Sequence, residues 1–133
     1  NLRPGTVMAL TTATGMVFGA YLPAVKMERF VEQSMHPQAF AQVVGSLSSW
    51  PELQPDLQEV RLRGMARVIG QPIPGVSAFA VPVFDHTGHI ALVLTVIGPT
   101  GGFDPDWEGE NARILKDIAA HISARLGFSP VAA

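Results

Sequence analysis

The chain has no cysteine, and only 15% of its 133 residues are charged. Without cysteine it has no disulfide, no thiolate nucleophile and no cysteine-ligated zinc site. Its nine Lys and Arg residues are scattered and its formal net charge is −2, so it lacks the basic stripe that binds a phosphate backbone. The longest largely apolar run, Ile90 to Ile97, is far shorter than the roughly 18 residues of a membrane span. These absences predict a cytoplasmic protein in which this segment does not itself bind nucleic acid.

Motifs for covalent catalysis are also missing. There is no G-x-S-x-G elbow and no S-x-x-K pair, and the glycines at 98–102 lack the Lys-Ser/Thr ending of a phosphate loop. The sequence therefore predicts a protein that is not an enzyme.

The apolar content of the chain is high, at 47%, which is enough for the chain to fold. We expect one domain over residues 1–133.

Apolar periodicity divides the chain into helices, a sheet and a last helix. Three stripes at i, i+3, i+4 predict amphipathic helices, and the third of them ends at Gly64. Beyond it the pattern favours β-strands, because β-branched and aromatic residues dominate. The stripes are Met27, Phe30, Val31; Phe40, Val43, Val44, Leu47; and Leu53, Leu57, Val60. The strands are Met65 to Ile69, Val76 to Phe84 and His89 to Ile97.

The last helix is predicted to begin at Asp104, as the N-cap, with Pro105 in its first turn. Asp106 and Glu108 suit the positive end of a helix without implying acid–base chemistry. One buried face is expected from the stripe Ile114, Ile118 and Ile122, with Leu115 and Ala119 beside it.

The two strands joined by 85–88 predict a hairpin with unlike faces. If Phe84 lies opposite His89, then Ala80 faces Val93, Ala78 faces Thr95 and Val76 faces Ile97. That face is underfilled, since it carries Ala78, Ala80, Ala91 and Thr95. The other face is bulky, with Phe79, Val81 and Val83 against Ile90, Leu92, Leu94 and Val96. Either another element packs closely on the alanines, which the pattern favours, or a pocket remains.

The stretch Thr11-Thr12-Ala13-Thr14-Gly15 supports the pocket to some extent. Small residues at a possible helix start leave backbone N–H groups free to bind a carboxylate or carbonyl. An ordinary threonine N-cap, which satisfies the same donors internally, explains the residues about equally well.

Histidine gives no metal site. His86 and His89 with Asp85 could clip a metal, but they occupy a turn and no further ligand lies nearby in the sequence. His36 and His121 are isolated. We expect no metal ligand, no cofactor and no catalytic residue.

Several segments together resemble the C-terminal effector-binding domain of IclR-type transcriptional regulators. The matching segments appear in the family's order from about residue 5 to the last helix. They are Thr12-Ala13-Thr14-Gly15 to Ala20, Arg63-Gly64-Met65, Ile73 to Asp85, Gly88, and Leu94 to Pro99.

The resemblance implies an α+β, GAF-like fold, in which an antiparallel sheet is flanked by helices and followed by a long C-terminal helix. It also implies a small-molecule effector, a homodimer or homotetramer, and operator DNA bound only through an N-terminal helix-turn-helix that this chain lacks. The first part of the sensor domain would be missing too. A GAF-like sensor in a non-DNA-binding signalling protein is the alternative. A methionine sulfoxide reductase on the same fold would need a redox cysteine.

The resemblance also implies the ligand-binding positions. Relatives that sense small oxo-acids can have a carboxylate at Val68 and hydroxyls at both Thr95 and Ile97, whereas this sequence has one hydroxyl among the three. We therefore expect an apolar or aromatic carboxylate as the effector, with its acid group near Thr14. The positions are Ala13, Thr14, Gly15, Val68, Val76, Ala78, Thr95 and Ile97.

Overall fold

The computed structural model describes residues 6–34, 42–44 and 50–130. Two sheets are present there. One is a short parallel pair, and the other is a three-stranded antiparallel sheet in the order β3-β4-β5. The elements in chain order are β1 (Thr6–Met8), α1 (Ala13–Tyr21), α2 (Ala24–Ser34), β2 (Gln42–Val44), α3 (Trp50–Arg63), β3 (Ala66–Ile69), β4 (Val76–Phe84), β5 (Ile90–Pro99), the 3₁₀ turn η2 (Thr100–Gly102) and α4 (Glu110–Arg125).

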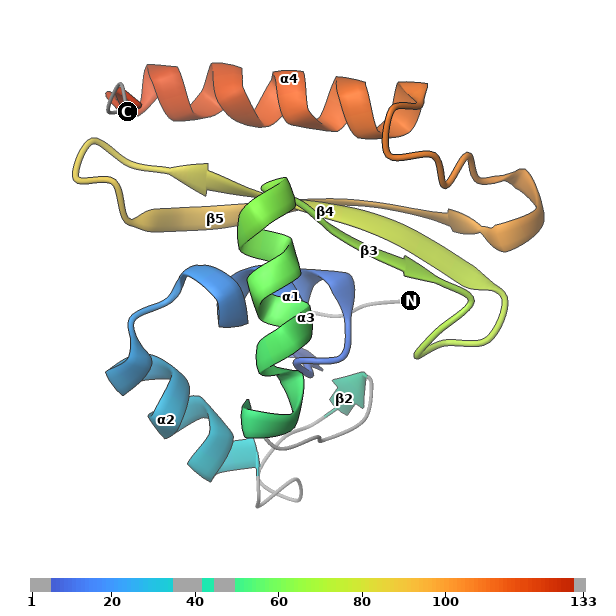
Figure 1. Cartoon of the computed structure of the whole chain (residues 1–133), viewed down its shortest axis with the longest axis horizontal. Coiled ribbons are helices and arrows are strands. Elements are labelled where there is room, and N and C mark those ends of the chain that lie inside the picture. Colours follow the sequence, from blue (N-terminus) through green and yellow to red (C-terminus); the bar gives the residue numbers. More distant parts are fainter. Residues whose placement is uncertain (1–5, 35–41, 45–49, 131–133) are drawn as a thin grey trace.

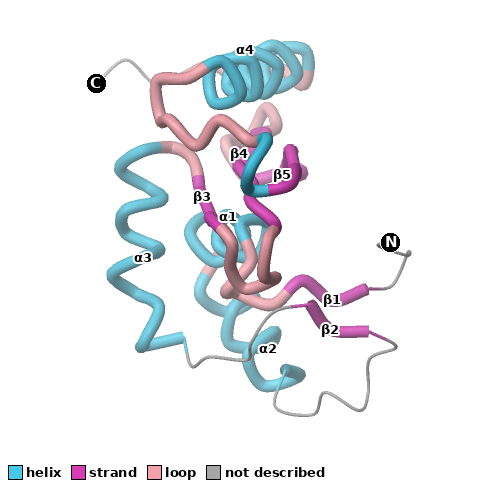
Figure 2. The backbone as a smooth tube through the Cα atoms, turned by 90° about the vertical axis from the view of Figure 1, so that its right-hand side faces the viewer, coloured by secondary structure: helices cyan, strands magenta, loops and turns pink. Residues whose placement is uncertain are grey.

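The three-stranded sheet lies between two sets of helices. In Figure 1, α4 runs along one face of this sheet, and α1, α2 and α3 are on the other side; Figure 2 shows the same layers from the side. Helix α1 packs directly on all three strands, and α3 packs against α1. The predicted α+β architecture with a long C-terminal helix is confirmed. No helix in the described ranges is long and apolar enough to cross a membrane.

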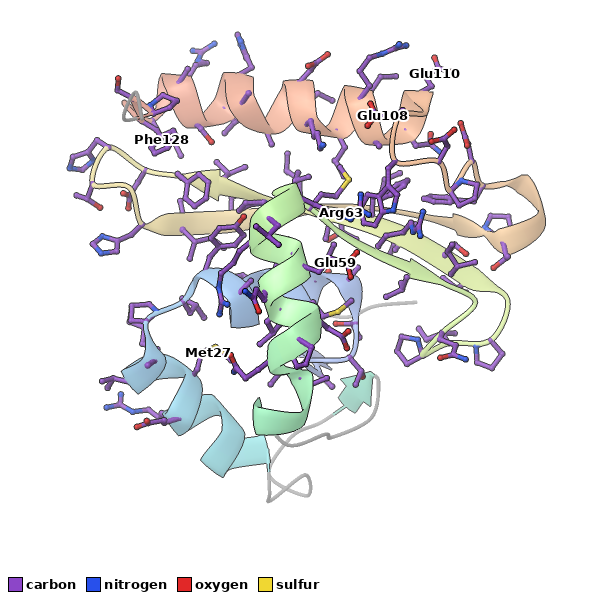
Figure 3. The ribbon with its side chains drawn as sticks, in the orientation of Figure 1. Met27, Glu59, Arg63, Glu108, Glu110 and Phe128 are labelled. Atoms are coloured by element: carbon purple, nitrogen blue, oxygen red, sulfur yellow. The ribbon has the colours of Figure 1, made fainter. Side chains whose placement is uncertain are left out.

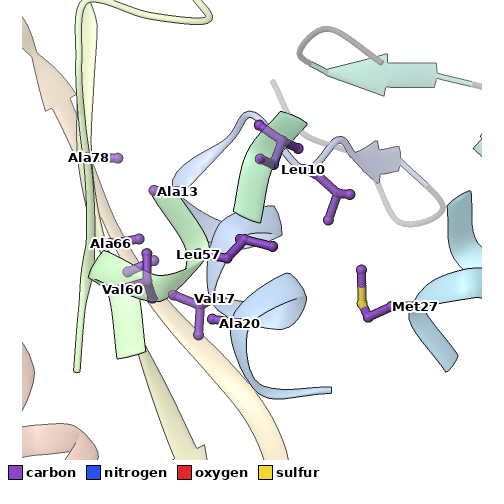
Figure 4. Close-up of a cluster of buried hydrophobic side chains, with 11 residues drawn as sticks. Leu10, Ala13, Val17, Ala20, Met27, Leu57, Val60, Ala66 and Ala78 are labelled. Carbon is purple, nitrogen blue, oxygen red and sulfur yellow. The ribbon is translucent and has the colours of Figure 1, made fainter. Parts of the chain in front are cut away.

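Helix α1 covers the alanine-rich face of the hairpin. Ala13, Val17 and Ala20 of α1 share one buried cluster with Ala78 and Ala80 of β4 (Figure 4). Small side chains on both elements let the helix approach the sheet closely, so most of the space above the alanines is filled. Close packing, the alternative that the pattern favoured, is therefore correct over most of this face.

The other face of the sheet forms a second core beneath α4. Phe79, Val81 and Val83 are at most 2% exposed there. The Phe79 ring lies 5.4 Å from the ring of Phe103 and 5.7 Å from that of Trp107, measured between centroids. Helix α4 contacts these bulky strand residues through Ala112, Leu115 and Ala119, and the two alanines allow the helix to approach the sheet closely.

The hairpin register differs from the predicted one. Ala78 lies opposite Ile97 and Ala80 opposite Thr95, a shift of two residues that leaves these four side chains on their predicted face. Phe84 lies opposite Ile90 and Val83 opposite Leu92, so Ala91 is an extra residue in β5. This bulge turns Ile90 toward the α1 core, whereas strict alternation had placed it on the bulky face.

Helix α4 corrects two predictions. It begins at Glu110 after the N-cap Gly109, because Asp104 instead accepts the Asp106 N–H, at 3.1 Å, in a turn before the helix. Ile114 and Ile118 are 46% and 47% exposed. The buried face is the neighbouring row of Ala112, Leu115, Ala119 and Ser123, because this row packs on the bulky residues of β4.

The helices before the sheet are partly as predicted. Helices α2 and α3 confirm the first and third stripes, and α3 is followed by Gly64 with φ +71°, a conformation that suits glycine. The second stripe is wrong at Val43 and Val44, which belong to β2 and pair with Val7 and Met8 of β1. Two β-branched residues adopt a strand when a distant partner is present. The remainder of that stripe lies outside the described residues.

Candidate functional site

The start of α1 is fixed by a network around Thr12. The Thr12 hydroxyl donates to the carbonyl oxygen of Ala9 at 2.7 Å and accepts the N–H of Gly15 at 2.9 Å. A Cβ at position 15 would overlap the Ala9 carbonyl oxygen. Glycine is therefore needed for the chain to turn this tightly into the helix.

Two donors at this helix start are unused. Thr12 satisfies the amide of Gly15, and the Thr12 carbonyl accepts the amide of Met16 at 2.8 Å. Within the described residues, the amides of Ala13 and Thr14 have no hydrogen-bond partner. Unpaired N–H groups at a helix N-terminus attract an anion, and the helix dipole adds to that attraction. The N-cap and the free donors, which were weighed as alternatives, therefore coexist.

A small cavity of about 40 Å³ lies where α1 meets the hairpin. The hydroxyl groups of Thr14 and Thr95 hydrogen-bond across this interface at 2.7 Å, joining α1 to β5. In Figure 4, Ala13 lies beside Ala78 at this junction. The cavity is lined by Thr12, Ala13, Thr14, Gln71, Ile73, Val76, Ala78, Thr95 and Ile97.

The chemistry of this cavity suits a carboxylate with an apolar body. None of its lining residues has an ionisable side chain, so the attraction for an anion comes from backbone N–H groups and threonine hydroxyls. The walls formed by Val76, Ala78 and Ile97 are apolar. Because one water needs roughly 10–15 Å³ of such space, the cavity as it stands has room for only a few non-hydrogen atoms.

Six of the eight sequence-predicted site residues line the cavity: Ala13, Thr14, Val76, Ala78, Thr95 and Ile97. Gly15 does not line the cavity, and its amide already donates to the Thr12 hydroxyl. Val68 pairs with Ala78 but lines the neighbouring cavity. Gln71 and Ile73 were not predicted, and Thr12 was predicted only as part of the stretch 11–15 and not as a site position. Thr12 could have been found as the last polar residue before an apolar helix, whereas the position of the loop carrying Gln71 and Ile73 depends on tertiary packing.

The neighbouring cavity is larger, about 430 Å³, and lies between α3 and the edge strand β3. Its walls are mixed, with Asp56 and Glu59 from α3 and Arg67 from β3. Glu59 pairs with Arg63 at 3.0 Å, one turn further along α3 (Figure 3). Arg67 is held by the carbonyl oxygen of Pro105 at 2.8 Å and stacks on the Trp107 ring, 4.3 Å from its centroid.

The turn that contains the two histidines has a structural role. The Asp85 carboxylate accepts the N–H groups of Thr87 and His89 and the Thr87 hydroxyl. The hydrogen bond from the Thr87 side chain is the main cause of a lowered pKa at Asp85. His86, His89 and His121 are exposed, and the described part of the chain contains no cluster of three potential metal ligands.

Comparison with protein families matches residues 3–124 to the family described as "Bacterial transcriptional regulator IclR C-terminal". Among curated proteins, HTH-type transcriptional regulator KdgR of Dickeya chrysanthemi is 29% identical over 118 residues, which cover 89% of this chain and 38% of that protein. HTH-type transcriptional repressor AllR of Klebsiella pneumoniae is 28% identical over 82 residues, covering 62% of this chain and 30% of that protein.

Solved structures agree with these matches. The crystal structure of Pseudomonas aeruginosa HmgR superimposes with a TM-score of 0.76 and 31% identity, over 92% of this chain and 46% of that one. The C-terminal domain of E. coli KdgR gives a TM-score of 0.69 and 26% identity, over 89% of this chain and 70% of that one. The chain spans less than half the length of the curated relatives KdgR and AllR.

Proposed function

Because the chain belongs to the family of bacterial IclR transcriptional regulators, as their C-terminal domain, we propose that it binds a small-molecule effector at the junction of α1 with the β4–β5 hairpin. One observation carries the proposal. The unpaired amides of Ala13 and Thr14 lie beside an apolar cavity that also contains the hydroxyl of Thr95. A buried donor without a partner costs stability, and an effector carboxylate would supply the missing acceptor.

We assign the effector to the apolar or aromatic carboxylates. Its acid group would accept the two amides. Its body is larger than the cavity of about 40 Å³, so it would push neighbouring side chains aside and contact Val76, Ala78 and Ile97. A small oxo-acid would leave its keto oxygen with few partners, since Thr14 and Thr95 are the hydroxyl-bearing residues at the centre of the site and bond to each other. Apolar walls with few placed polar groups favour ligands of low polarity.

A thermal-shift panel tests this assignment. We expect benzoate and 3-phenylpropanoate to raise the melting temperature of the purified protein, because a ligand at one hundred times its Kd stabilises the folded state by about 2.7 kcal/mol. Glyoxylate and pyruvate should have little effect at equal concentration. Stabilisation by the two oxo-acids, with none by the aromatic acids, would contradict the assignment.

The rest of the proposed function concerns the full-length protein. Effector binding would shift the population of subunit arrangements in a homodimer or homotetramer. A helix-turn-helix domain outside residues 1–133 would convey that shift to operator DNA, in a cytoplasmic protein without enzyme activity. The names of the relatives support this proposal, since KdgR and AllR are HTH-type transcriptional regulators. Residues 1–133 would then be the effector-binding domain.

A further inference from the structure

The cavity at the start of α1 and the neighbouring cavity between α3 and β3 share one residue in their walls, Gln71. The smaller cavity measures about 40 Å³ and the larger about 430 Å³. Adjacent residues line different cavities: Thr11 lines the larger cavity and Thr12 the smaller one. Likewise, Val68 lines the larger cavity, and its strand partner Ala78 lines the smaller one. The cavities are therefore neighbours, and ligand sites generally occupy about 300–1,000 Å³. The larger cavity has this volume but does not include Ala13 and Thr14, and the smaller cavity includes them but is too small. A ligand site of ordinary size that contains the free amides of α1 therefore needs both cavities.

Gln71 belongs to a loop that is anchored at both ends. The Gly70 amide donates to the carbonyl oxygen of Val76 at 3.0 Å, and the Thr100 amide donates to that of Gly75 at 2.9 Å. Gly70 and Gly75 have φ of +66° and +79°, which other residues adopt only with strain. The base of the loop, between β3 and β4 in Figure 1, is thus held in place.

The side chain of Gln71 itself has freedom to move. Gln71 is exposed, and no hydrogen bond or ion pair holds its side chain to another described residue. A ligand that pushes it toward solvent breaks no protein contact of this kind, whereas moving Val76 or Ala78 would break the sheet. A ligand can therefore displace the side chain of Gln71 more easily than the strand residues that line the smaller cavity.

We propose that Gln71 determines which ligands the domain accepts, by separating the amide-lined cavity from the larger one and limiting the length of the carboxylate. This inference rests on the proposed function. A short acid fits beside the α1 amides with Gln71 in place. An elongated arylalkanoate must displace Gln71 and extend into the larger cavity, so part of its binding energy offsets that displacement.

The test is the substitution Gln71→Ala, measured by titration calorimetry with propanoate, benzoate and 3-phenylpropanoate. Removing the side chain should tighten 3-phenylpropanoate at least tenfold and benzoate less, and should change propanoate less than twofold. Gln58→Ala is the matched control, because Gln58 is an exposed glutamine of α3 that lines neither cavity. It should leave all three affinities unchanged.

Two failures can be told apart. If Gln71→Ala binds all three acids as the wild type does, while Ala78→Val still weakens them, the role of Gln71 is wrong and the effector site stands. If neither the wild type nor Gln71→Ala binds any of the three acids, the proposed function is overturned together with this inference. The proposed role of Gln71 would also be wrong if Gln71→Ala bound propanoate at least twofold more tightly and gained the same factor for 3-phenylpropanoate. Equal gains would mean that the length of the acid does not matter.

Discussion

Replacing Gly15 by alanine is expected to lower the free energy of unfolding by about 3 kcal/mol, the upper part of the usual range for overpacking. The added Cβ would overlap the Ala9 carbonyl oxygen and lie 2.9 Å from the Thr12 hydroxyl oxygen. A backbone carbonyl cannot rotate away as a side chain can, so the start of α1 must shift. A melting temperature roughly 10 °C lower should result, measured by calorimetry.

Gly101→Ala is the control for this substitution. Nothing lies within 4 Å of a Cβ built at Gly101, and its φ is not in the positive region. Its stability should change by less than about 0.5 kcal/mol, as at an ordinary surface position. If Gly15→Ala and Gly101→Ala had the same melting temperature, the tight turn from Ala9 into α1 would be wrong, and so would the position of the free amides.

Ala78→Val is expected to weaken effector binding about 10- to 100-fold. Ala78 is 6% exposed and lines the cavity of about 40 Å³. Two added methyl groups would occupy the space that the ligand needs. Overpacking of this kind costs about 1–3 kcal/mol, and each 1.4 kcal/mol is a factor of ten in affinity. Titration calorimetry with benzoate measures the change.

The control for Ala78→Val is Ala91→Val. Ala91 is also a hairpin alanine, but it is exposed at the bulge in β5 and lines neither of the two cavities beside α1. It should bind benzoate as the wild type does. Unchanged affinity in Ala78→Val, with a melting temperature near that of the wild type, would place the ligand somewhere else.

The site could be predicted from sequence as far as periodicity and turn chemistry extend. Strand alternation separated the alanine face from the Phe79 face correctly, even though the register was two residues away, because a two-residue shift preserves the faces. The bulge at Ala91 could not be foreseen, since alternation has no signal for an inserted residue.

Tertiary packing decided the remaining differences. The isoleucine stripe at 114 and 118 is the more apolar row of α4, yet the row with alanines faces the sheet, because Phe79 and Val81 already fill that space. Val43 and Val44 form a strand only because residues 7 and 8 lie beside them. Gln71 belongs to no periodic pattern, and its proposed role follows from two cavities whose walls come from five separate stretches of the chain.

The central claim is that the amides at the start of α1 bind an effector carboxylate. The most direct measurement is a ¹⁵N-resolved NMR titration of the purified protein with benzoate. The account predicts that the amide protons of Ala13 and Thr14 shift downfield as they gain an acceptor, with smaller changes at Ala78 and Thr95. Unchanged Ala13 and Thr14 signals at saturating benzoate, with the changes located at other residues, would contradict it.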